Sequence, residues 1–147
     1  MEELIRLLNE GGYSCVVRHG EETRTFSRRG VADLYDLYRT DRDFLKGAWL
    51  ADKVIGKGAA ALMVLGGVAR VWTRVISTPA LTLLRNGGVE VAFAEEVPCI
   101  INRTCTGRCP LETLCDVSDN PVALYPVIEG FVSRMREAAE KEKTIVK

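Results

Sequence analysis

Apolar and polar positions alternate along this chain with periods that predict alternating helices and strands. Apolar residues at positions 4, 5, 7 and 8 share one stripe of a helix, which Gly11 and Gly12 end. Residues 13–18 and 23–27 have the period of two strands, and the short polar turn between them predicts a hairpin. Residues 31–38 return to the helical period and predict a second amphipathic helix.

Residues 45–95 alternate apolar strands with helices of small residues. We predict strands at residues 48–51, 68–76 and 89–93. Residues 52–57 lead into a helix that ends at residues 66–67, and residues 77–79 begin another. A β-α-β-α-β order favours a sheet with parallel strands and crossover helices. Together with a final helix from residue 121 to about residue 141, the pattern predicts one α/β domain over residues 1–147, a three-layer α/β/α sandwich with a mixed sheet.

The composition is that of an ordinary globular domain without a large net charge. The chain has 147 residues, 47% of them hydrophobic, and its 20 basic and 20 acidic residues cancel. This balance argues against nucleic acid or an acidic membrane as a partner. The apolar run over residues 59–68 is too short to cross a membrane, and the start of the chain does not resemble a secretory signal. With five cysteines, an odd number, we expect free thiols and a cytoplasmic protein that needs no cofactor.

The predicted order of elements resembles the cytidine deaminase superfamily. In zinc deaminases a His-x-Glu triplet opens one helix, and Pro-Cys-x-x-Cys opens the next. In the comparable places this sequence has Asp52-Lys53 and then residues 77–81, which supply no thiolate, while the lone histidine, His19, falls in the hairpin turn. We therefore expect a deaminase-like fold without the zinc ligands, which excludes zinc-dependent deamination and leaves open whether the protein is an enzyme.

A narrower resemblance covers nearly the whole chain. It rests on residues 51–57, on Ile76-Ser77, on Asn102-Arg103 and on residues 106–112. These segments are similar to the family known as domain of unknown function 1893, DUF1893. The resemblance implies a deaminase-like fold and a site location, and it implies no activity.

The two helix starts are the first candidate site, because they lie along one edge of the predicted sheet. Free N–H groups and the positive dipole end of a helix suit an anionic group. The residues we expect to bind a small anionic or nucleotide-like ligand there are Asp52, Lys53, Lys57, Ser77 and Thr78, joined from the following loop by Asn102, Arg103 and Glu112. The alternative is structural: Asp52 and Thr78 cap their helices and the lysines are solvated.

The cysteines suggest two other hypotheses about the function. Residues 109–112 read as a helix start with Cys109 at its cap, where the helix end and a neighbouring arginine would lower the pKa of the thiol of a nucleophilic or redox enzyme. Cys99, Cys105, Cys109 and Cys115 form a cluster that suggests a metal or iron–sulfur module, although only Cys105 and Cys109 have the spacing of a zinc pair. The apolar residues 122–125 are either core or the contact of a homodimer.

Overall fold

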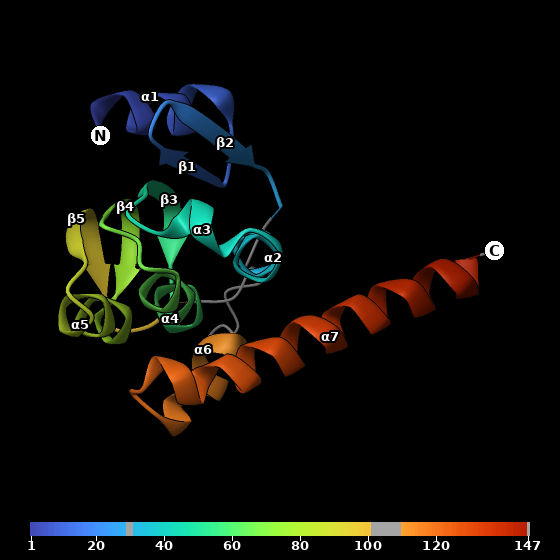
Figure 1. Cartoon of the computed structure of the whole chain (residues 1–147). Coiled ribbons are helices and arrows are strands. Elements are labelled where there is room, and N and C mark those ends of the chain that lie inside the picture. Colours follow the sequence, from blue (N-terminus) through green and yellow to red (C-terminus); the bar gives the residue numbers. More distant parts are fainter. Residues whose placement is uncertain (29–30, 101–109, 147) are drawn as a thin grey trace.

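A five-stranded mixed sheet forms the centre of the molecule (Figure 1). The computed structural model describes residues 1–28, 31–100 and 110–146. The strands lie in the order β2-β1-β3-β4-β5. β1 is antiparallel to both of its neighbours, whereas β3, β4 and β5 are parallel. The bounds are β1 Cys15–His19, β2 Glu22–Phe26, β3 Trp49–Ile55, β4 Arg70–Ser77 and β5 Glu90–Val97.

Helices cover both faces of this sheet and confirm the predicted α/β fold. They are α1 Glu2–Gly11, α2 Ala32–Thr40, α3 Arg42–Leu45, α4 Lys57–Gly66, α5 Thr78–Asn86, α6 Pro110–Leu114 and α7 Pro121–Val146, with a 3₁₀ turn at Cys115–Val117. The crossover helices α4 and α5 lie on one face, as two parallel connections running in the same direction require. α1 lies on the other face, so the sheet is the middle of three layers.

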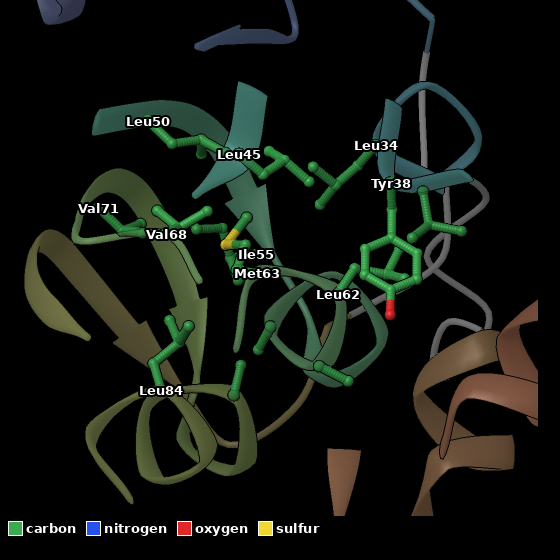
Figure 2. Packing of buried hydrophobic residues seen from close by; sticks show 14 of the residues in the cluster. Leu34, Tyr38, Leu45, Leu50, Ile55, Leu62, Met63, Val68, Val71 and Leu84 are labelled. Carbon is green, nitrogen blue, oxygen red and sulfur yellow. The ribbon is translucent and has the colours of Figure 1, made fainter. Parts of the chain in front are cut away.

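The main core lies between the sheet and α4 and α5 (Figure 2). Leu50 on β3, Val71 on β4 and Leu62 on α4 are fully buried there. α4 reads as small and apolar over most of its length because α2, α5, α6 and α7 also pack against it. A smaller cluster under α1 contains Leu4, Leu8, Val16 and Ala51, which explains the apolar stripe at the start of the sequence.

The third strand is longer than predicted, so two candidate residues expected at a helix start lie in a strand instead. β3 runs to Ile55, so Asp52 and Lys53 lie within a strand and do not begin a helix. The reason is pairing on both sides: Asp52 is opposite Cys15 of β1 and Thr73 of β4. A strand flanked by two partners extends as far as its neighbours offer hydrogen bonds. α4 begins only after Gly56.

The last helix, α7, is 26 residues long and packs by its first half. Leu124, Ile128 and Val132 are buried on one stripe, while Val122 is 67% exposed. Further along, Arg136 bonds both carboxylate oxygens of Asp36 on α2 at 2.7 Å. Beyond this point the helix extends away from the domain (Figure 1). The segment 122–125 is thus partly core, and the homodimer remains a prediction. Across residues 1–28, 31–100 and 110–146 no helix combines the length and the apolar character of a membrane span.

Candidate functional site

A cleft of about 670 Å³ opens at the edge of the sheet where β3 ends. β1 begins at the same edge, because it runs antiparallel to β3. β1 and β3 are therefore neighbours that run in opposite directions. Open α/β sheets bind ligands in crevices at the carboxyl ends of their strands. The cleft therefore lies where the fold itself favours a ligand site.

Five segments line the cleft, and all but two of them are far apart in the sequence. They come from the start of β1, the region before and in α2, the end of β3, the start of α4, and the chain around α6. The lining residues are Gly12, Ser14, Cys15, Ser27, Arg28, Val31, Asp33, Leu34, Asp52, Lys53, Val54, Gly56, Gly58, Ala59, Ile100, Leu111 and Glu112.

The side chain of Glu112, a residue of α6, lies against the N-terminus of α4. This side chain is 2% exposed, and its Oε2 accepts a hydrogen bond of 2.7 Å from the backbone N–H of Lys57, the first residue of α4. A carboxylate at this end of a helix is stabilised by the helix dipole and by the free N–H groups. Its second oxygen, Oε1, is buried and has no hydrogen-bond partner among the described residues. A buried carboxylate oxygen without a partner is a rare and costly feature.

Two glycines allow α6 to sit against the start of α4. A Cβ at Gly56 would lie 2.8 Å from Oε2 of Glu112, and one at Gly58 would lie 2.6 Å from Cδ2 of Leu111. Both distances are shorter than real contacts allow. The Gly-Lys-Gly sequence at the start of α4 thus has a packing role, consistent with the absence of a Walker loop.

Asp52 and Cys15 form a pair on the wall made by β1 and β3. Oδ1 of Asp52 accepts a hydrogen bond of 3.3 Å from the N–H of Val54. Burial raises the pKa of Asp52 to about 7, and bonds from the N–H groups of Val54 and Lys53 and from the Cys15 thiol only partly oppose this. Burial, reinforced by Asp52, also raises the pKa of the Cys15 thiol, so Cys15 is a neutral donor and not a thiolate nucleophile.

The opposite wall is an ion-pair network. Arg28 pairs with Asp33, and its second nitrogen lies 3.0 Å from Asp36. Asp36 in turn bonds Arg136 of α7, and these two arginines hold the pKa of Asp36 below its ordinary value despite its partial burial. Both Arg28 and Asp33 line the cleft. The positive charge of Arg28 is therefore already balanced by carboxylates of α2.

The residues predicted at the second helix start have partners within the fold. Ser77 is buried, and its Oγ accepts a bond of 3.2 Å from the N–H of Ala80. Thr78 donates its hydroxyl to Glu96 at 2.7 Å. Neither lines the cleft. The prediction that Asp52 and Thr78 are the helix caps is wrong: Asp52 lies inside β3, and Ser77 caps α5 because its extended backbone comes directly before the first turn.

The two predicted lysines also differ from expectation. Lys57 is 5% exposed, and its Nζ lies 2.7 Å from Asp119, so its ammonium pairs with that carboxylate, and Lys57 does not line the cleft. Lys53 lines the cleft, but side chains alternate along a strand and Lys53 follows Asp52 directly. Its side chain consequently leaves β3 on the α1 side of the sheet. The structure brings together Asp52, Lys53 and Glu112 and leaves out Lys57, Ser77 and Thr78.

Several predicted residues lie outside the described part of the chain. These are Asn102, Arg103, Cys105 and Cys109. Of the remaining two members of the cysteine cluster, Cys115 is buried in the core and Cys99 is half-buried after β5. Within the described ranges no three His, Cys, Asp or Glu side chains gather as metal ligands would. The thiol-enzyme and metal-module hypotheses remain predictions.

The role of Ser77 can be measured directly. Ser77→Ala is expected to lower the free energy of unfolding by about 1 kcal/mol, because the N–H of Ala80 loses its cap inside the protein. Thr82→Ala in the same helix is the control: Thr82 is exposed and bonds only within the helix, so alanine should raise stability by a few tenths of a kcal/mol. Urea unfolding of both variants checks the difference, and equal effects would contradict the capping role.

Sequence reasoning missed most of the β1 and α2 walls of the cleft. Cys15 and Ser14 read as ordinary strand residues, and Arg28 reads as a surface arginine. Glu112 was expected at the third position of its own helix, which is correct, but its carboxylate serves α4 instead. The one usable signal was the pair of glycines at positions 56 and 58, which are unusual at the start of an apolar helix and indicate close approach of another segment.

Comparison with known proteins agrees with this architecture. A crystal structure of a DUF1893 family protein (TM1506) from Thermotoga maritima superimposes with a TM-score of 0.81 at 22% identity, over 88% of this chain and 87% of that chain. At this identity the match establishes the fold alone. Comparison with curated proteins found no match.

Two further solved structures match with lower scores. They are a diaminohydroxyphosphoribosylaminopyrimidine deaminase/5-amino-6-(5-phosphoribosylamino)uracil reductase from Thermotoga maritima, with a TM-score of 0.43 at 17% identity, and RibD from Acinetobacter baumannii, with 0.42 at 18%. The matches cover 64% and 63% of this chain and 35% and 33% of those chains. Nothing about the activity of this protein follows from them.

The family assignment rests on the sequence itself. The family model described as TM1506, domain of unknown function (DUF1893), matches residues 3–132. This range includes every element from α1 to the packed half of α7, and it agrees with the resemblance predicted from residues 51–57 and 106–112. The chain belongs to the DUF1893 family.

Proposed function

We propose that this domain binds a small polar molecule in the cleft between β1, β3, α4 and α6, and that a hydrogen-bond donor of the ligand bonds Oε1 of Glu112. The observation that carries the proposal is the orphaned oxygen itself. It belongs to a side chain that is 2% exposed and that lines a cleft of about 670 Å³. A ligand N–H or O–H group would satisfy it, and a charged hydrogen bond of this kind contributes about 1.5–3 kcal/mol.

The start of α4 favours a donor over an anion. An anion expected from the sequence would seek the N–H groups at this helix end, but the carboxylate of Glu112 is already bonded there. A second anion would face the negative charge of Glu112 across a short distance, which is unfavourable in a partly buried site. A nucleotide-like ligand fits this arrangement if N–H groups of its base, and not its phosphates, approach Glu112.

The size and lining of the cleft suit a ring-sized ligand. Its volume falls in the range of small-molecule sites, and apolar side chains of Val31, Leu34, Val54 and Leu111 alternate with the polar groups. Apolar walls with a few fixed polar groups hold a flat organic molecule in one orientation.

A screen with and without the carboxylate tests the proposal. Amide signals of residues 52–59 in ¹H–¹⁵N NMR spectra are expected to shift with donor-bearing nucleosides and heterocycles. Glu112→Gln keeps an acceptor for the N–H of Lys57 but offers an amide in place of the two-oxygen carboxylate, so affinity should fall about 10- to 100-fold. Glu95→Gln, an exposed position on β5 outside the cleft, should bind like the wild type.

Two results would count against this function. One is a broad screen in which no compound shifts the signals of the cleft. The other is binding that Glu112→Gln leaves unchanged although its spectrum shows a folded protein.

A further inference from the structure

The charged residues that line the cleft differ in whether they already have a partner. Among its lining residues Asp33, Asp52 and Glu112 are acidic, and Arg28 and Lys53 are basic. Arg28 is balanced by its pairs with Asp33 and Asp36, and Lys53 leaves β3 on the opposite face from Asp52. The groups that remain for a ligand are the two carboxylates, Asp52 and Glu112.

Within residues 1–28, 31–100 and 110–146 no basic side chain forms an ion pair with Glu112 or Asp52. Glu112 receives one backbone N–H, and Asp52 receives backbone N–H groups and the Cys15 thiol. The nearby ammonium of Lys57 is directed to Asp119. Two carboxylates that face one cleft without a cationic partner attract a cation, and a planar group with several N–H donors matches carboxylate oxygens best.

We propose that the cleft selects a small molecule with a planar, positively charged N–H donor group of the amidine type, which hydrogen-bonds Glu112 and Asp52 together. This inference rests on the proposed function and adds the chemical class of the ligand. The apolar residues Val31, Leu34, Val54 and Leu111 would contact the remaining hydrocarbon part of such a molecule. The ligand class is opposite in charge to the one that the helix starts predicted from the sequence.

Binding of such a cation is coupled to the proton on Asp52. Cys15 of β1 and Thr73 of β4 are opposite Asp52 in the sheet, and the other charged groups that line the same cleft are Arg28, Asp33, Lys53 and Glu112. Burial raises the pKa of Asp52 to about 7, so a bound cation must displace its proton in acid and finds the carboxylate ionised in base. Affinity for an amidine should therefore rise with pH, whereas affinity for a neutral analogue should not.

Three probes of one shape separate the possibilities: benzamidine, benzamide and benzoate, which are a cation, a neutral molecule and an anion. NMR titrations at about pH 5.5 and about pH 8.5 are expected to show benzamidine binding most tightly, with affinity about tenfold higher at the upper pH. Asp52→Asn should remove this pH dependence, and Glu112→Gln should weaken benzamidine at both pH values. Glu95→Gln on β5 should leave all three titrations unchanged.

The outcomes distinguish this inference from the proposed function. If benzamide or benzoate binds in the cleft as tightly as benzamidine, the domain binds small molecules but the cation selectivity is wrong. If benzamidine binds equally at both pH values in the wild type, the role of Asp52 is wrong. If none of the three probes shifts the signals of residues 52–59 and the broader screen also finds nothing, both proposals fail.

Discussion

Leu62→Ala is expected to lower the free energy of unfolding by about 2–5 kcal/mol. Leu62 is fully buried on α4, the helix that packs against α2, α5, α6 and α7 (Figure 2). Alanine would lose the transfer free energy of the removed atoms and leave a cavity, because the helices packed around α4 limit relaxation. Urea unfolding followed by circular dichroism measures the loss.

The same substitution at an exposed site provides the control. Leu114 on α6 is 37% exposed, so Leu114→Ala should cost less than about 1 kcal/mol. A similar loss for both variants would mean that α4 is not the centre of the core. The comparison also matters for the cleft, because α4 presents the helix start that Glu112 covers.

Asp52→Asn is expected to stabilise the protein by about 2–4 kcal/mol above neutral pH and to have a much smaller effect near pH 4. The pKa of Asp52 is raised from 3.8 to about 7 in the folded protein. Between these values the native state holds a proton that the unfolded state has lost. The stability that this group contributes is therefore complete below about pH 4 and is lost as the pH rises to about 7. Asparagine cannot ionise, so the variant avoids that loss.

The size of the effect of Asp52→Asn on the unfolding free energy and the direction of its pH dependence can be measured separately. Asp52 is still partly open to the cleft, so solvent reduces the full linkage free energy, and the lower end of the range is expected. The test plots the difference in unfolding free energy between variant and wild type from about pH 4 to about pH 8.5 under reducing conditions. Asp43→Asn on the exposed surface of α3 should follow the wild type at every pH. A difference that stays flat, or falls with pH, would contradict the raised pKa.

The raised pKa and the orphaned oxygen of Glu112 have a common physical origin. Both carboxylates accept bonds from backbone N–H groups at the cleft, and in the part of the chain that the structure describes neither pairs with a basic side chain. Such an arrangement lowers the stability of the protein, and carboxylates with perturbed pKa values cluster at functional sites. If Asp52→Asn stabilises the protein and also abolishes the pH dependence of amidine binding, the same carboxylate lowers the free energy of unfolding and binds the ligand.

Much of the fold could be predicted because it depends on local patterns. The hairpin, the helix over residues 31–38, the crossover helices and the start of α5 at residues 77–79 all follow from periodicity, glycine and proline. The prediction was wrong at residues 52–53, because the length of β3 depends on its pairing with β1 and β4 as well as on its own sequence. Val54 and Ile55, both β-branched, were the available signal for the longer strand.

For the candidate site, the sequence by itself determined the chemistry that was available, and the tertiary structure decided how it is used. The family agrees with the resemblance that the sequence indicated. Asp52, Lys53 and Glu112 line one cleft, and their role in ligand binding stays a prediction. Only the fold could show that the carboxylate of Glu112 covers the start of α4 and that Lys57 pairs with Asp119. These contacts join residues far apart in the chain. Because a protein carboxylate already occupies the helix end, the ligand that we propose is a cation and not the anion expected from the sequence.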